Sequence, residues 1–228
     1  MLILFDIDGT LLRTEGAGMT AMLSAARDLY PEHSFSFDGI SISGRLDRLI
    51  WRDLMSNAGV EPTTHRHDAF RHAYGEHLRR GFDDTSRSMA LGGAIDLVQA
   101  LSDNDDYSIG LLTGNYEHTG RLKVAHAGFD LAHFKCNAWA DDGEHRRDLP
   151  MVAMERHRLA HGKSIDPSQV VIVGDTPLDI DCAHFNGCNV IAVATGHHPL
   201  GELAGHEPDL LLPGLEDWKA IVSWMSGR

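Results

Sequence analysis

Cysteine is scarce in this chain of 228 residues. Its three cysteines, Cys136, Cys182 and Cys188, leave one over from any pairing and include no CxxC spacing, and no secretory apolar segment follows Met1. We therefore expect a fold without disulfides and a cytoplasmic location. Long apolar runs are missing too, since no stretch approaches the roughly 20 apolar residues that cross a bilayer. This excludes a membrane span.

Positive charge is also in short supply. The chain has 20 Lys and Arg residues against 33 Asp and Glu residues, which gives a formal net charge of −13. A field of this sign repels nucleic acid and anionic membranes unless a basic patch reverses it locally, and the sequence has only short arginine clusters. We therefore expect neither nucleic acid nor a membrane as a partner. The sequence leaves open whether the protein is a monomer or a homodimer.

Short apolar runs alternate with helical patterns over much of the chain. The runs cover residues 2–5, 109–112, 170–173 and 190–193, and helical spacing appears near 94–101, after Asn115, and over 151–159 and 177–186. Continuous apolar strands separated by helices indicate a parallel sheet that is covered on both faces. The sequence therefore predicts an α/β fold with a Rossmann-like, doubly wound parallel sheet.

The hundred residues after the first strand follow a different pattern. Their apolar positions recur at helical spacing around residues 22–29, 46–54 and 70–77. We predict a helical domain of residues 15–86, inserted after the first strand of a core formed by residues 1–14 and 87–228. Residues 13–16 and the polar stretch 83–88 are the candidate linkers.

Carboxylates follow the first predicted strand, at Asp6 and Asp8. In a doubly wound sheet, ligands bind in the crevice beyond the carboxyl ends of the strands, so polar side chains there are candidates for chemistry. One carboxylate can act as a covalent nucleophile while a second, nearby carboxyl group moves the proton. The alternative is a solvated Asp-Gly turn.

Two later strand ends carry complementary polar groups. Thr113, Gly114 and Asn115 offer a hydroxyl and free amides that suit a phosphate oxygen, although Thr113 or Asn115 could simply cap a helix. Asp175 and Asp179 offer the hard oxygen ligands that suit Mg²⁺, although Asp175 could be an N-cap and Asp179 a surface acid. Four acids clustered in one crevice would be costly without a cation, which favours a metal.

In order and spacing, these motifs resemble those of the haloacid dehalogenase superfamily, in its phosphoglycolate phosphatase and beta-phosphoglucomutase branch. The resemblance rests on residues 6–10, on Thr113 after an apolar run, and on residues 174–179, and it spans nearly the whole chain. It implies that Asp6 is the nucleophile and Asp8 the general acid and base. It also implies that Asp6, the main-chain carbonyl of Asp8 and Asp175 hold Mg²⁺.

The same resemblance assigns roles to the remaining polar groups. Thr113, with the amides of Gly114 and Asn115, corresponds to the phosphate-binding group. Asp179 corresponds to the second acid near the metal, or it orients other groups there.

The third motif departs from the family pattern, in which a Lys followed by Pro neutralises the phosphoryl charge. The matching region, residues 143–150, contains Arg146 and Arg147 but no lysine. A guanidinium can serve as well as an ammonium. We assign the role to Arg146, with Arg147 as the close second; a solvated loop is the alternative for either.

The helical insertion resembles the cap that closes over the active site in this branch and expels water. Within it, residues 43–47 form a glycine-containing break before a helix, which makes Arg45 a candidate for substrate specificity. The alternative is a solvated arginine in the first turn of that helix.

The resemblance implies a Mg²⁺-dependent phosphatase that hydrolyses a small-molecule phosphomonoester through an aspartyl-phosphate intermediate. A phosphomutase would use the same acids and return the phosphoryl group to a second hydroxyl. A non-catalytic phosphate-binding module is the alternative from another class, but it would need no pair such as Asp6 and Asp8. A 2-haloacid dehalogenase is disfavoured because those relatives lack the second acid.

Overall fold

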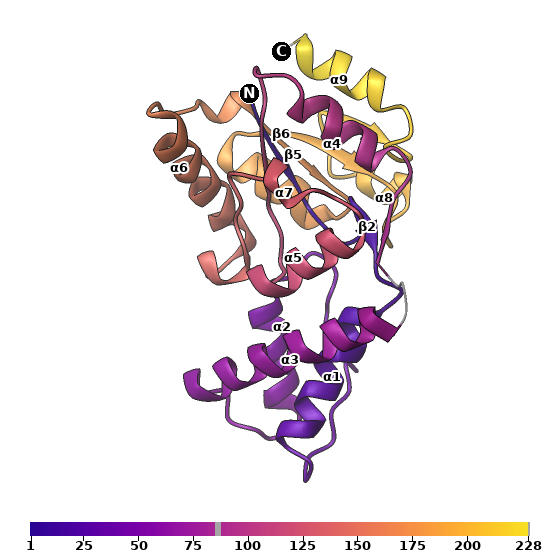
Figure 1. The fold of residues 1–228 in the computed structure, drawn as a ribbon, viewed down its shortest axis with the longest axis vertical. Coiled ribbons are helices and arrows are strands. Elements are labelled where there is room, and N and C mark those ends of the chain that lie inside the picture. Colours follow the sequence, from indigo (N-terminus) through magenta and orange to yellow (C-terminus); the bar gives the residue numbers. More distant parts are fainter. Residues whose placement is uncertain (85–87, 228) are drawn as a thin grey trace.

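A five-stranded parallel sheet lies at the centre of the fold (Figure 1). The computed structural model describes residues 1–84 and 88–227. The sheet order is β4-β1-β5-β6-β7. With these strands numbered along the chain, the order is 2-1-3-4-5, a doubly wound arrangement whose direction switches between β1 and β5. The predicted fold class is confirmed. The strands are β1 (Leu2–Phe5), β4 (Ser108–Leu111), β5 (Val170–Gly174), β6 (Asn189–Val193) and β7 (Leu210–Leu212).

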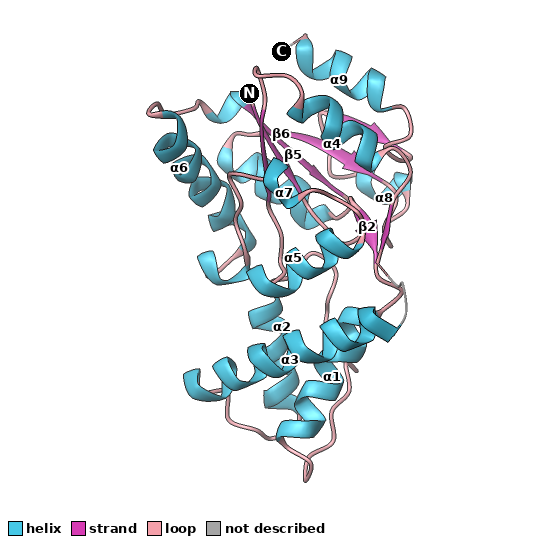
Figure 2. Ribbon diagram, in the orientation of Figure 1, coloured by secondary structure: helices cyan, strands magenta, loops and turns pink. Residues whose placement is uncertain are grey.

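Helices cover both faces of this sheet, which is why its strands carry no polar alternation (Figure 2). Successive strand residues point to opposite faces, so Leu2 and Leu4 join one buried cluster while Ile3 and Phe5 join the other. The first cluster includes residues of α6 (Leu149–His161), α7 (Pro177–Asn186) and α8 (Leu200–Ala204). The second includes residues of α4 (Ala94–Ser102), α5 (Glu117–His126) and α9 (Trp218–Ser226).

Three further helices lie together beside the core, at the opposite end of the molecule from the two termini (Figure 1). They are α1 (Ala17–Leu29), α2 (Asp47–Asn57) and α3 (Thr64–Asp84), and together with the loops that join them we call them the three-helix group. Their buried faces carry the apolar side chains that the helical spacing predicts, including Met22, Leu54 and Phe70.

The three-helix group is joined to the core through a small antiparallel ladder that the sequence analysis did not predict. In it, β2 (Leu12–Arg13) pairs with β3 (Met89–Ala90). Arg13, expected in a linker, is therefore part of a strand. Residues 85–87 of the other predicted linker lie outside the described residues, and the proposed domain boundaries stay a prediction.

Short 3₁₀ turns complete the chain: η1 (Leu131–His133), η2 (Ala140–Asp142), η3 (Arg146–Asp148) and η4 (Pro167–Gln169). All three cysteines are buried and unpaired. Within the described part of the chain, no helix has both the length and the apolar character that crossing a membrane requires.

Candidate active site

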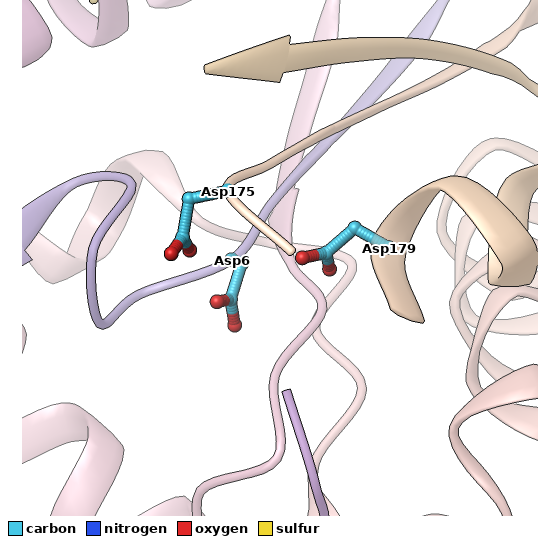
Figure 3. Close-up of side chains that lie close together, drawn as sticks. All are labelled: Asp6, Asp175 and Asp179. Carbon is cyan, nitrogen blue, oxygen red and sulfur yellow. The ribbon is translucent and has the colours of Figure 1, made fainter. Parts of the chain in front are cut away.

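Three buried carboxylates meet beyond the carboxyl ends of β1 and β5, the two neighbouring strands at which the strand order reverses. Asp6 follows β1, Asp175 follows β5, and Asp179 lies in the first turn of α7. One oxygen from each lies within 4.8 Å of the others, and the residues are 4%, 3% and 0% exposed. Figure 3 shows Asp6 between the other two side chains. The sheet topology therefore brings together acids that are about 170 residues apart in the sequence.

The main chain closes tightly around Asp175. The hydroxyl of Thr10 donates to Asp175 Oδ1 at 3.1 Å. Gly9 has a positive φ of 85°, and a Cβ on Gly9 or on Gly196 would overlap the Asp175 carboxylate. Glycine at these two positions therefore allows both loops to approach the acid.

One guanidinium links these acids to the three-helix group. Arg146 Nη2 lies 3.1 Å from Asp6 Oδ1 and also contacts Asp179 Oδ1, while Nη1 donates to the carbonyl oxygen of Gly44 at 2.8 Å. The buried Nε has no hydrogen-bond partner among the described residues. Arg147 instead pairs with Asp181 at the surface. Of the two arginines that the sequence proposed, Arg146 is the one that reaches the acids.

Asp179 is held on both of its oxygens. Oδ1 contacts Arg146, and Oδ2 accepts hydrogen bonds from the Thr176 hydroxyl at 2.7 Å and from the Thr176 N–H at 3.1 Å. Thr176 is the N-cap of α7, and Pro177 follows at the first helical position. Asp175 is therefore not the cap, and Asp179 is not a surface acid.

Burial and crowding shift the pKa values of this cluster. Burial raises the pKa of Asp6 from its ordinary 3.8 to about 6; Arg146 opposes the shift, and Asp179 and Asp8 add to it. Burial, together with Asp6 and Asp179, raises the pKa of Asp175 well above its usual range. Three carboxylates thus share one guanidinium, so the cluster suits a divalent cation.

The residues after β4 form the opposite wall of the site. The Asn115 side chain donates to Thr113 Oγ1 at 2.9 Å, and α5 begins after Tyr116, whose side chain makes no capping bond. Neither Thr113 nor Asn115 is therefore a helix cap. The Gly114 carbonyl accepts a hydrogen bond from the Asp47 N–H at 2.6 Å, which joins this loop to α2.

The sequence analysis missed two charged residues beside Asp8. Lys123 Nζ lies 2.6 Å from Asp8 Oδ2, and the buried Asp47 carboxylate accepts a bond from the Tyr116 N–H. Burial raises the pKa of Asp47 to about 7, with Lys123 opposing the shift. Lys123 belongs to no motif. The structure buries it together with Gly120 and Val124 on the inner face of α5, a placement that no sequence motif signals.

Arg45 is not among the residues that the fold brings together at the acids. Its guanidinium pairs with Asp53 at 2.8 Å and donates to the Ser41 carbonyl. The main chain of Arg45 comes closer to the site, since a Cβ on Gly114 would overlap its carbonyl oxygen. Its role in specificity stays a prediction.

Polar contacts hold the three-helix group against the carboxyl ends of the strands. Beyond the Arg146 and Asp47 contacts, four side-chain pairs cross the boundary at 2.8 to 3.2 Å: Ser43 with His198, Arg48 with Glu144, His67 with Tyr116, and Arg71 with Asp141. In this arrangement Asp6, Asp175 and Asp179 are almost fully buried.

Comparison with known proteins agrees with this geometry. Residues 3–193 match the family described as haloacid dehalogenase-like hydrolase, so the chain belongs to that family and is a hydrolase. The resemblance proposed from the sequence is thus confirmed.

Individual relatives extend the comparison along the chain. It is 26% identical over 220 residues to pyrophosphatase PpaX from Anoxybacillus flavithermus, covering 96% of this chain and 95% of that protein. Two solved structures are similar in fold. CbbY from Rhodobacter sphaeroides, in complex with phosphate, has a TM-score of 0.74 at 18% identity and covers 95% of each chain. A protein from Haemophilus somnus, described as a predicted phosphoglycolate phosphatase, has a TM-score of 0.68 at 20% identity and covers 97% of each chain.

Proposed function

We propose that this protein is a Mg²⁺-dependent phosphatase that hydrolyses a small-molecule phosphomonoester through an aspartyl-phosphate intermediate. The observation that carries the proposal is the contrast between two neighbouring carboxylates. Asp6 is buried with Arg146 and two further acids, whereas the Asp8 side chain is 39% exposed and pairs with the Lys123 ammonium group. Carboxylates in such different environments suit different roles, one as nucleophile and one as proton carrier.

The donor set fits a hard divalent cation. Asp6 and Asp175, together with the main-chain carbonyl of Asp8, would hold Mg²⁺ with oxygen ligands. Asp179 would act chiefly by orienting Arg146, because its oxygens are already engaged by Arg146 and Thr176. When bound, the cation offsets the negative charge that the phosphoryl group brings to the carboxylates.

The reaction follows from these positions. An oxygen of Asp6 attacks phosphorus, the bond from phosphorus to the ester oxygen breaks, and that oxygen takes the electron pair and a proton from Asp8. Water then attacks the phosphorus of the aspartyl phosphate and gives a proton to Asp8, which restores both carboxyl groups and releases inorganic phosphate. Arg146 and the amides of Gly114 and Asn115 would bind the phosphoryl oxygens.

The three-helix group would act as the cap of this site. Its contacts through Gly44 and Asp47 close the acids off from water, so substrate entry requires the group to separate from the core. The name of the PpaX relative adds inorganic pyrophosphate to the substrates worth testing.

The test is phosphate release from a panel of phosphorylated metabolites, pyrophosphate and 4-nitrophenyl phosphate, with Mg²⁺ and with a chelator. We expect the wild type to release phosphate with Mg²⁺, to lose this activity with the chelator, and to regain it when Mg²⁺ is added back. We expect Asp6→Asn to release no phosphate under any of these conditions. Isomerised sugar phosphates in place of free phosphate would identify a phosphomutase. A protein that binds phosphate and turns over nothing in the panel would contradict both enzymes and favour a binding module.

Metal binding has a second readout in stability. The raised pKa values of Asp6 and Asp175 mean that the folded protein holds protons that the unfolded chain has released. For Asp6, this contribution to the free energy of unfolding is complete below about pH 4 and lost as pH rises through about 6. At pH 8 these carboxyl groups have lost their protons, and bound Mg²⁺ would compensate their negative charge. Mg²⁺ should therefore raise Tm by several degrees at pH 8 and much less at pH 5.

Thermal unfolding of the metal-free protein with and without Mg²⁺ measures this difference. Asp175→Asn should lose the shift at pH 8, while the same substitution at the exposed Asp103 should keep it. An equal shift at the two pH values, or a full shift in Asp175→Asn, would contradict a metal held by these carboxylates.

A further inference from the structure

A buried lysine stands beside the proposed proton carrier. The Lys123 side chain is 6% exposed and comes from the last turn of α5. Burying an ammonium costs several kcal/mol unless it is paired and hydrogen-bonded. Its Nζ lies 2.6 Å from Asp8 Oδ2 and 2.5 Å from Asn115 Oδ1. The lysine therefore meets both residues that flank the phosphoryl site on this side.

The contacts fix one oxygen of Asp8 and leave the other free. Asp8 Oδ2 accepts from Lys123 and, at 2.8 Å, from the side-chain amide of Asn115. Asn115 is itself anchored on Thr113. Within residues 1–84 and 88–227, no hydrogen bond to Asp8 Oδ1 is present. The carboxylate is thus held by two donors on one side and open on the other.

We propose that Lys123 is a positioning residue for Asp8. Together with Asn115 it holds Oδ2, so that Oδ1 faces the ester oxygen, delivers the proton when the bond from phosphorus breaks, and takes a proton from the attacking water. This role rests on the proposed function, because it requires Asp8 to be the proton carrier. Fixing a catalytic group in a productive orientation is a recognised source of rate.

A purely structural role predicts something different. The charge of Lys123 also acts on the Asp47 carboxylate of α2. A Cβ on Gly18 of α1 would lie 3.3 Å from the Tyr74 hydroxyl of α3 and 3.4 Å from Lys123 Nζ. If the lysine served only to balance charge between the core and the three-helix group, its removal would lower stability and slow every substrate equally.

A comparison of leaving groups separates the two roles. Nitrophenolate departs without a proton, whereas an aliphatic alcohol needs one. The measurement is kcat/KM, which reports the steps up to loss of the leaving group, for 4-nitrophenyl phosphate and for an aliphatic phosphomonoester that the wild type hydrolyses. The proteins are the wild type, Lys123→Met, Asp8→Asn and the double variant. Lys135→Met serves as the matched control at an exposed lysine.

We expect Asp8→Asn and Lys123→Met each to lower the ratio of aliphatic to aryl kcat/KM, Lys123→Met by about tenfold or more. The double variant should show no further fall beyond Asp8→Asn, and Lys135→Met should match the wild type. Lys123→Gln provides a polar replacement in case the methionine variant does not fold.

The outcomes distinguish this proposal from the function on which it rests. A folded Lys123 variant that slows both esters equally, or leaves both unchanged, while Asp8→Asn lowers the ratio, would overturn the positioning role and leave the phosphatase intact. A wild type that hydrolyses neither ester would overturn the proposed function, and the positioning role with it.

Discussion

Replacing Asp6 by asparagine is expected to lower phosphate release by a factor on the order of 10⁴ or more, because removing the covalent nucleophile of an enzyme has effects of this size. The amide nitrogen and oxygen cannot attack phosphorus, so the aspartyl phosphate does not form. The fold should survive, since the amide has nearly the same shape and one fewer buried charge has to be balanced by Arg146.

Single-turnover phosphate release measures the loss of activity in Asp6→Asn, and thermal unfolding tests whether the variant keeps its fold. Asp103→Asn is the matched control, because Asp103 is exposed at the end of α4, far along the chain from the acids. Activity in a folded Asp6→Asn variant above about one tenth of wild type would contradict the nucleophile assignment, and unfolding of the variant would contradict the expectation that the fold survives.

A chemical trap identifies the atom that is modified. Acid quenching during turnover should leave phosphate on Asp6 in the wild type, found by mass spectrometry and removed by hydroxylamine, as an acyl phosphate requires. Phosphate found on Asp8 instead would exchange the roles of the two residues.

The parts of the fold that the sequence predicts are those with a strong local pattern. The continuous apolar runs near Val170 and Val190 became β5 and β6, because a strand buried on both faces has no polar positions. Helix α7 begins at Pro177 and ends before Gly187, whose φ is +71°, so its predicted bounds are confirmed. The pair β2 and β3 escaped prediction because strands of two residues have no detectable period.

The residues of the site likewise fall into those that the sequence predicts and those that it does not. Asp6 and Asp175 follow strands that the sequence predicts, so their meeting at the switch point could be anticipated. Lys123 could not, because its burial depends on how α5 packs between the sheet and the three-helix group. Arg45 shows the opposite case: the break before α2 does reach the site, but the Arg45 side chain pairs with Asp53 of α2 instead.

Arg146 is the second position where a large effect is expected. Its guanidinium joins Asp6, Asp179 and the Gly44 carbonyl at once. A lysine carries a single point charge and no planar fork, so Arg146→Lys should lower kcat/KM by roughly 10² to 10³. In the metal-free protein, Arg146→Met leaves two buried carboxylates without their counterion and should cost about 3–5 kcal/mol of unfolding free energy.

The neighbouring arginine offers a matched control for both substitutions. Arg147 pairs with Asp181 at the surface, so Arg147→Lys and Arg147→Met should leave activity and Tm unchanged. Steady-state kinetics and denaturant unfolding on the four variants make the comparison. Equal losses at the two positions, or a larger loss at Arg147, would show that the third-motif cation has been assigned to the wrong residue.

The unpartnered Nε of Arg146 gives a reason to expect this residue to bind the phosphate ligand. A buried N–H without an acceptor costs about 1–3 kcal/mol, and Nε has none among the described residues. A phosphoryl oxygen bound beside Asp6 would supply that acceptor. With Mg²⁺ present throughout, adding inorganic phosphate should therefore raise the Tm of the wild type and of Arg147→Met further, but not that of Arg146→Met. An undiminished shift in Arg146→Met would place the phosphate elsewhere.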